Sequence, residues 1–359
     1  AIALQPSHSH SSAHATTTSH VFPSSAVATA DFDLDGHADI VLADPVTNEC
    51  SILRNNGSND FTVLDPITLT VGKRPRAAIA ADFNLDGYPD LAVACEGSGA
   101  VYIYLNSSTN PGTFTTSIVT CPAPSSIAAG RLSLDPDPDL AVASATNNSL
   151  SILRNQGDGS FIALIPIANA GGSDGVIVAV DIGDLDNDKD LEEVSTIAGI
   201  EDASPVQGRV QSYFLDIDVD PTDPIIINNL VTTSLPAGYD PVDAVLHDFD
   251  NDLDSLADLA IATTSTNAVL YLKNRGPDPI NDGWLGFDTP QIYGPIDDAP
   301  SALSAGILPP PDSLADIAVV LPSVSQVLIL TNTGSASPRF TLGSPFASPP
   351  GGTVDVASL

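Results

Sequence analysis

The sequence predicts an all-β protein, a β-propeller of four-stranded blades, and three observations support this prediction. An acidic loop motif recurs about every 50 to 65 residues along the chain. The apolar residues of the chain, mainly Val, Ile, Leu and Ala, fall in short runs. These runs are interrupted by 26 Gly and 30 Pro among 359 residues. Short apolar runs bounded by turn residues favour many short strands over helices.

The acidic motif has the spacing of a calcium loop. In its first copy Asp31, Asp33, Asp35, Gly36 and Asp39 lead directly into the apolar run 40–43. Oxygen ligands at loop positions 1, 3, 5 and 9, with a backbone carbonyl at position 7, form the oxygen-only cage that calcium prefers, and the glycine permits the sharp turn. An EF-hand instead closes with an acid at position 12 and lies between helices. The apolar run that follows here at once predicts a loop between two strands.

Four copies of the loop are predicted to bind calcium, giving three to four sites. The first two carry full ligand sets, the fourth ends in glutamate, and the fifth has two extra residues before its last acid. Aspartates also cap ordinary turns, but four copies in register favour a metal. The predicted ligands, with backbone carbonyls at His37, Tyr88 and Asp190, are Asp31, Asp33, Asp35, His37, Asp39, Asp82, Asn84, Asp86, Tyr88, Asp90, Asp184, Asp186, Asp188, Asp190, Glu192, Asp248, Asp250, Asp252, Asp254 and Asp258.

Two copies have lost their ligands. The third places Arg131 and Ser133 where acids belong and keeps Asp135 and Asp139. We expect the Arg131 guanidinium to pair with these carboxylates in place of a metal. The sixth, around residues 309–316, retains too few acids and is predicted to be a plain turn stiffened by proline.

The repeats begin near residues 31, 82, 131, 184, 248 and 307, and each contains four short apolar segments. Four strands at this period are typical of a propeller blade. Residues 13–31 resemble 114–131, and residues 353–359 resemble an inner strand. We therefore predict one domain of seven blades, with six repeats over about 23–351 and a seventh blade shared by residues 1–22 and 352–359.

The units resemble FG-GAP or VCBS repeats, the blades of the integrin α-subunit propeller, over nearly the whole chain. The resemblance rests on the motifs at Asp31–Asp39 and Asp82–Asp90 and on the four-segment period. It implies that the acidic loop joins the first and second strands of a blade and binds calcium. It also implies that ligands meet the opposite face.

Charge and composition limit the partners. A net charge of −34 argues against nucleic acid and anionic membranes, and no apolar run is long enough to span a membrane. Of the 45 acidic residues only five are Glu, so the excess of Asp indicates ligand and turn chemistry, with salt adaptation a weaker contribution. The chain has no Met and no signal peptide, which indicates a processed product. Sequons at Asn56, Asn106 and Asn147 suit a secreted glycoprotein, although each asparagine also suits a turn.

Other features leave alternatives open. Cys50, Cys95 and Cys121 allow one disulfide or free thiols, and His8, His10 and His14 form a polar loop or a zinc or copper site. Trp284 packs at a blade edge or stacks on a sugar. The fourth repeat carries an insertion around 198–209, which is either drift or a binding loop.

No catalytic motif is found in the sequence, so we expect a non-catalytic protein. The predicted function is a secreted or cell-surface calcium-binding recognition, adhesion or extracellular assembly module. Its partner is an extracellular protein or glycan, or further copies of the chain. The alternative is a lectin-like propeller or an accessory part of a polysaccharide-degrading enzyme.

Overall fold

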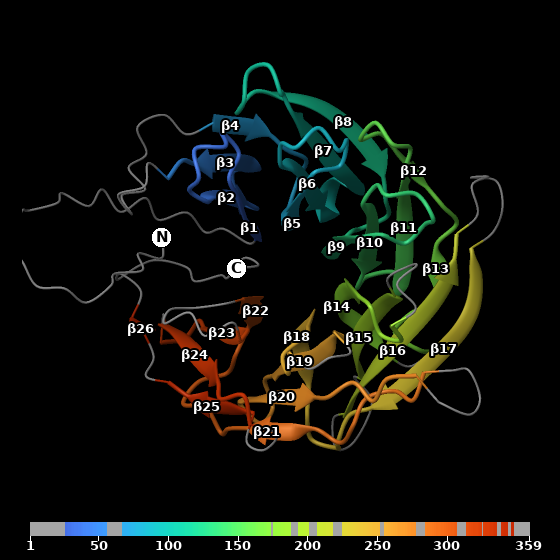
Figure 1. The fold of residues 1–359 in the computed structure, drawn as a ribbon, viewed down its shortest axis with the longest axis vertical. Helices are drawn as coiled ribbons and strands as arrows, with labels where there is room; N and C mark the ends of the chain where they lie inside the picture. The colour runs from blue at the N-terminus through green and yellow to red at the C-terminus, as the bar shows by residue number, and fades with distance from the viewer. Residues whose placement is uncertain are drawn as a thin grey trace, which may run out of the picture.

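The computed structural model is an all-β propeller with six blades arranged around a common centre (Figure 1). It describes residues 26–55, 67–173, 175–187, 193–200, 207–217, 225–251, 255–277, 284–306, 314–324, 326–335, 339–343 and 346–347. Within these ranges every blade is an antiparallel meander that starts at the centre of the ring and moves outward. No helix in the described ranges has the length and hydrophobicity needed to cross a membrane.

The first three blades cover residues 26–168. Blade 1 contains β1 (Ala26–Ala30), β2 (Asp39–Asp44), β3 (Glu49–Leu53) and β4 (Ile67–Thr70). Blade 2 contains β5 (Pro75–Ala81), β6 (Asp90–Cys95), the short 3-10 helix η1 (Glu96–Ser98), β7 (Ala100–Asn106) and β8 (Phe114–Thr120). Blade 3 contains β9 (Ser126–Gly130), β10 (Asp139–Ser144), β11 (Ser149–Asn155) and two outer pieces, β12 (Phe161–Ala163) and β13 (Ile167–Ala168).

The last three blades repeat this order. Blade 4 contains β14 (Val176–Gly183), β15 (Glu193–Ile200), β16 (Gln207–Asp216) and β17 (Ile226–Ser234). Blade 5 contains β18 (Pro241–His247), β19 (Asp258–Thr263), β20 (Ala268–Leu272) and β21 (Gln291–Tyr293). Blade 6 contains β22 (Ala302–Gly306), β23 (Asp316–Leu321), β24 (Gln326–Asn332), β25 (Phe340–Leu342) and β26 (Phe346–Ala347).

The second strand of a blade is its most buried strand. All six residues of β6, β10, β19 and β23 are buried, because both faces of the sheet are covered by neighbouring blades. These strands therefore have continuous apolar sequences, such as 91–94. A sheet with only one buried face would instead alternate apolar and polar residues. Five hydrophobic clusters lie between consecutive blades, from blades 1 and 2 to blades 5 and 6.

The prediction of seven blades was wrong: the propeller has six. Each of the six repeats already supplies a complete meander, and blade 1 obtains all four strands from residues 26–70. The seventh blade was inferred from likeness between short apolar stretches, which recur wherever strands have the same burial. Residues 1–22 and 352–359, including the histidine cluster, lie outside the described ranges.

The insertion predicted at residues 198–209 consists mainly of longer strands. Strands β15 and β16 extend as a ladder as far as the pair Ile200 and Gln207. The insertion therefore lengthens the sheet of blade 4, and its tip at 201–206 lies outside the described ranges.

Candidate metal-binding loops

The acidic loops join the innermost strand of a blade to its second strand, as expected. Residues 31–38 link β1 to β2, and residues 82–89 link β5 to β6. Because each blade repeats the same strand order around the ring, these loops gather on one face of the propeller. We call this the loop face, and the face at the other end of the strands the hairpin face.

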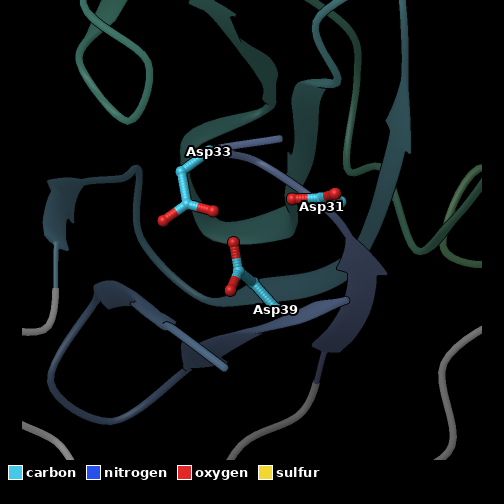
Figure 2. Close-up of side chains that lie close together, drawn as sticks. All are labelled: Asp31, Asp33 and Asp39. Carbon is cyan, nitrogen blue, oxygen red and sulfur yellow. The ribbon is translucent and has the colours of Figure 1, made fainter. Parts of the chain in front are cut away.

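The first loop turns its carboxylates toward one another. One oxygen from each of Asp31, Asp33 and Asp39 lies within 4.8 Å of the others (Figure 2). Asp31 also fixes the turn, because it accepts hydrogen bonds from the N–H groups of Asp35 at 3.0 Å and Gly36 at 2.8 Å. The Oδ2 atom of Asp33 lies 3.8 Å from Nε of the exposed Arg54 side chain, whereas its Oδ1 atom is buried and has no hydrogen-bond partner. A buried carboxylate oxygen without a partner is costly, and a cation between the three acids would satisfy it.

Asp35 and His37 are joined by a hydrogen bond on the exposed side of the loop. The Oδ1 atom of Asp35 accepts the N–H of His37 at 2.9 Å, and the group of three converging acids does not include Asp35. The predicted ligand set is thus brought together at Asp31, Asp33 and Asp39, while Asp35 and His37 close the turn on the exposed side.

The second loop repeats this geometry with one charge fewer. Asp82 accepts the N–H groups of Asp86 at 3.1 Å and Gly87 at 2.7 Å, and Asp86 accepts that of Tyr88 at 3.0 Å. Asn84 replaces the third-position acid. The backbone at position 4 of these turns is left-handed, with φ of 56° at Leu34 and 53° at Leu85.

The last acid of each loop also holds two strands in place. Asp39 accepts the N–H of Phe32 at 3.1 Å and that of Asn55 at 2.8 Å, and Asp90 accepts those of Phe83 at 2.9 Å and Asn106 at 2.7 Å. Burial raises the pKa of Asp39 to about 6 and that of Asp90 to about 7. A bound cation would favour the ionised form that these hydrogen bonds require.

In the fourth loop Glu193, which was not among the predicted ligands, lies with the acids Asp184 and Asp186. Oxygens of Asp184, Asp186 and Glu193 lie within 4.8 Å of one another, and Glu193 accepts the N–H of Leu185 at 2.8 Å. Glu193 begins β15 and pairs with Gly183, as Asp39 begins β2 and pairs with Ala30. The longer arm of glutamate spans the additional residue of this loop. Asp188, Asp190 and Glu192 lie outside the described ranges.

The fifth loop contains converging acids together with cations of the protein itself. Oxygens of Asp248, Asp250 and Asp258 lie within 4.8 Å of one another. The Lys273 ammonium contacts the Asp250 carboxylate, and the buried Arg339 guanidinium from blade 6 lies 3.7 Å from it. Asp250 is therefore already neutralised. Asp252 and Asp254 lie outside the described ranges.

The third loop also contains a guanidinium beside its carboxylates, that of Arg154. Arg154, at the end of β11, places Nη2 3.3 Å from an oxygen of Asp135 and is nearly buried. The Ser133 hydroxyl lies 3.0 Å from Asp135 Oδ1 and 2.9 Å from Asp139 Oδ2, so its one proton is shared between these two acceptors. Arg131 is exposed and donates from Nε to the Asp135 carbonyl at 3.4 Å. Arg154 directly precedes the asparagine that ends the third strand. Lys273 has the same position in blade 5 and also contacts its loop.

A recurring asparagine at the end of the third strand was missed by sequence reasoning. In blades 2, 3, 5 and 6 its Nδ2 donates to a carbonyl in the acidic-loop region of the preceding blade and to another in its own. The signal was available, because each follows the last acid of its loop by 16 residues. These residues are Asn106, Asn155, Asn274 and Asn332.

Other predicted features are placed by the structure as well. Trp284 is buried against Phe214 and Phe287 and donates from Nε1 to Asn274 at 2.7 Å, so it packs at a blade edge. The three cysteines are free and buried. Asn106 is buried with its amide hydrogen-bonded, which does not suit glycosylation, and Asn56 lies outside the described ranges.

Comparison with a family model decides the nature of the repeat. The FG-GAP-like repeat model matches residues 31–93, 82–142 and 131–195, that is, three tandem copies. Residues 31–195 carry FG-GAP-like repeats. The matched segments start at the first position of the acidic loops in blades 1, 2 and 3, which confirms the resemblance read from the sequence. Comparison with curated protein sequences finds no match.

Solved structures similar to this chain are also propellers or proteins of unstated function. A Lactobacillus plantarum protein aligns with a TM-score of 0.59 at 12% identity, covering 93% of this chain and 87% of its own. A functionally unknown Desulfotomaculum acetoxidans protein aligns at 0.55 and 11% identity, covering 86% and 79%. The Nup133 β-propeller domain of Vanderwaltozyma polyspora aligns at 0.50 and 12% identity, covering 79% and 76%. At these identities the similarity shows the fold alone.

Proposed function

We propose that this protein is a calcium-stabilised, non-catalytic β-propeller that presents a recognition or adhesion surface outside the cell. The observation that carries the proposal is the buried Oδ1 of Asp33, which has no hydrogen-bond partner and lies in a group of three converging carboxylates. An all-oxygen donor set of this kind fits calcium better than zinc or copper, which favour nitrogen and sulfur ligands.

Three loops are proposed to bind calcium. Asp31, Asp33 and Asp39 would hold the first ion, Asp82, Asn84 and Asp90 the second, and Asp184, Asp186 and Glu193 the third. Calcium supplies the positive charge that permits these acids to approach one another. The fifth loop is proposed to remain metal-free, because Lys273 and Arg339 already provide this charge to Asp250.

The difference between the two faces supports a role in recognition. On the loop face the acidic turns are closed by their own aspartates, so they have little freedom to vary. This face also carries the connections from the third to the fourth strands. The hairpin face carries the connections between blades. We propose that partners, either extracellular proteins or glycans, bind there, and that calcium keeps the blades rigid beneath them. The only tryptophan is buried, which removes the residue best suited to stack on a sugar and favours a protein partner.

Calcium removal tests the proposal. Because binding to the native state stabilises it, excess chelator should lower the melting temperature by more than about 5 °C, and magnesium should restore it poorly, since it resists dehydration. Native mass spectrometry should count three calcium ions. An unchanged melting curve in chelator contradicts the structural role of the metal.

A matched variant distinguishes the loops. Asp250→Ala should leave the ion count unchanged, because that carboxylate is paired with cations of the protein. Loss of an ion from this variant would place calcium in the fifth loop.

A further inference from the structure

A cluster of basic residues on the hairpin face stands apart from the acidic character of the chain. Lys73, Arg74 and Arg76 supply three of its 11 basic residues within four consecutive positions. They lie between β4 and β5 and at the start of β5, the end of that strand away from the acidic loop. With Glu96 of η1 they form what we call the basic cluster.

The backbone of the basic cluster is fixed from two blades. The N–H of Lys73 donates to the Ser98 hydroxyl at 2.6 Å, and the N–H of Arg74 donates to Asn48 Oδ1 in blade 1 at 2.8 Å. Their carbonyls accept the N–H groups of Gly97 at 2.9 Å and Glu96 at 3.0 Å. Arg74 is held with φ of 54°, a conformation that an arginine seldom adopts without such support. The side chains therefore project from a preorganised turn.

The charges of the basic cluster are not balanced within it. Nη2 of Arg74 and Nε of Arg76 converge on the same Glu96 oxygen, at 3.1 Å and 2.8 Å. The two arginine side chains are 58% and 46% exposed, whereas that of Glu96 is 17% exposed. Lys73 is exposed beside them. Two guanidinium groups thus share one carboxylate oxygen, with an exposed lysine next in the sequence, and about half of each arginine side chain is open to a second anion.

We propose that the basic cluster binds a short acidic segment of a protein partner. The carboxylates of this segment would contact Arg74 and Arg76 either beside Glu96 or in its place. The contact of two guanidinium groups with one Glu96 oxygen has the chemistry that we expect for a glutamate of the partner. The segment should be short, because the protein carries a net charge of −34 and would repel a long polyanion that extended beyond the cluster. This inference goes beyond the proposed function and does not depend on calcium.

Glu96 provides the test, because its carboxylate competes with the carboxylates of the partner for Arg74 and Arg76. A rhodamine-labelled peptide with alternating pairs of glutamate and glycine serves as the probe, measured by fluorescence anisotropy at low ionic strength. Glu96→Gln should tighten binding about threefold or more, since the arginines then lack their own carboxylate. The pair Arg74→Asn and Arg76→Gln should weaken binding at least about tenfold, with asparagine chosen because it tolerates a positive φ.

Controls separate this site from general charge effects. Arg275→Gln, which removes an equally exposed arginine paired with Asp288, should leave binding unchanged. A peptide with glutamine in place of glutamate should not bind. Thermal unfolding in the presence of calcium checks that each variant is folded. If the double variant does not fold, Arg76→Gln alone is used in its place.

Several outcomes would overturn the inference. They are absence of peptide binding, equal binding by the glutamine peptide, binding that Glu96→Gln leaves unchanged or weakens, and equal loss from Arg275→Gln. Binding of heparin as tight as that of the peptide, lost in the same variants, would show a sulfated polysaccharide site instead.

Discussion

At the scale of single residues, the last acid of each loop does more than supply a metal ligand. Asp139 and Asp316 belong to loops that lack a full ligand set, yet they accept the N–H groups of Asn155 at 2.8 Å and Asn332 at 2.7 Å, as Asp39 does that of Asn55 at 2.8 Å. This acid therefore fixes the end of the third strand with or without calcium. The earlier acids of the loop distinguish a metal site from a plain turn.

Asp33 should be the most informative ligand to remove. Asp33→Ala deletes the carboxylate whose Oδ1 has no hydrogen-bond partner, so the variant should bind one calcium fewer by native mass spectrometry. At a calcium concentration 100 times the dissociation constant, the lost binding corresponds to about 2.7 kcal/mol of unfolding free energy. Asp135→Ala, in the third loop, should retain every ion. Equal losses from both variants would contradict the distinction between these loops.

The recurring asparagine should contribute to stability through two blades at once. Asn155→Ala removes donors at 2.7 Å to Phe83 O in blade 2 and at 3.0 Å to Pro138 O in blade 3. Two buried carbonyls would lose this donor, at a cost of about 2 to 4 kcal/mol in urea unfolding. Gln156→Ala is the control, because the neighbouring Gln156 is exposed and donates from Nε2 to the adjacent Asn155 carbonyl at 3.3 Å. A loss at Asn155 no larger than that at Gln156 would refute the role between blades.

At the scale of elements, a loop and the end of the third strand act together. Blade 2 has Leu105 where blade 3 has Arg154 and blade 5 has Lys273. In blades 3 and 5 that side chain contacts a loop carboxylate, with Arg154 at 3.3 Å. Blade 1 has Arg54 at this position, but its Nε lies 3.8 Å from Asp33 Oδ2, its side chain is 47% exposed, and Asp33 Oδ1 has no hydrogen-bond partner. A basic residue that reaches the loop closely thus provides the charge that a metal would otherwise supply, whereas Arg54 leaves that charge incomplete.

This relation predicts that the third loop can be converted into a calcium site. Four substitutions together give it the pattern of the second loop, namely Arg131→Asp, Ser133→Asn, Pro136→Gly and Arg154→Leu. The third is needed because Pro136 stands where Gly87 adopts a φ of 87° and donates its N–H to Asp82. This quadruple variant should bind one additional calcium by isothermal titration calorimetry. The loop changes without Arg154→Leu should gain little, because the Arg154 guanidinium still neutralises Asp135. Equal gains with and without Arg154→Leu would show that the strand end does not control metal binding.

The elements that could be predicted from the sequence are those governed by local chemistry. The acidic turn around Gly36 and the buried run at 91–94 were located correctly, because turn geometry and burial on both faces leave a pattern in adjacent residues. Arg154 and Arg339 could not be assigned to their loops in this way. Their partners lie 19 and 89 residues away in the chain. The folding of blade 3 brings Arg154 to Asp135, and the packing of blade 6 on blade 5 brings Arg339 to Asp250. The place of Glu193 in the fourth loop likewise depended on where β15 begins.

At the scale of the whole molecule, the number of blades was the least predictable property. Each blade interface is local to two neighbours, so the repeat specifies how one blade packs on the next and not how many complete the ring. Charge, by contrast, is a property of the whole molecule that can be read from composition. The net charge of −34 and the buried acids of the loops both make stability sensitive to pH.

Without calcium, the unfolding free energy should fall as the pH rises from about 4 to about 7. Burial raises the pKa of Asp39 and Asp139 to about 6, and that of Asp90 and Asp258 to about 7, from 3.8. In this window the folded state binds more protons than the unfolded state, so ionisation costs stability that is not regained at higher pH. Calcium should reduce the decline at Asp39 and Asp90, because the ion favours their charged form.

Urea unfolding at several pH values, with calcium and with chelator, measures both effects. Adding salt is the control for general repulsion: screening weakens the effect of surface charge, while the contribution from burial persists. A decline that disappears completely in high salt would assign it to the net charge. An unfolding free energy that rises with pH in chelator would show that the buried loop acids are stabilised as carboxylates by the protein alone, and the loops would then have no need of a cation.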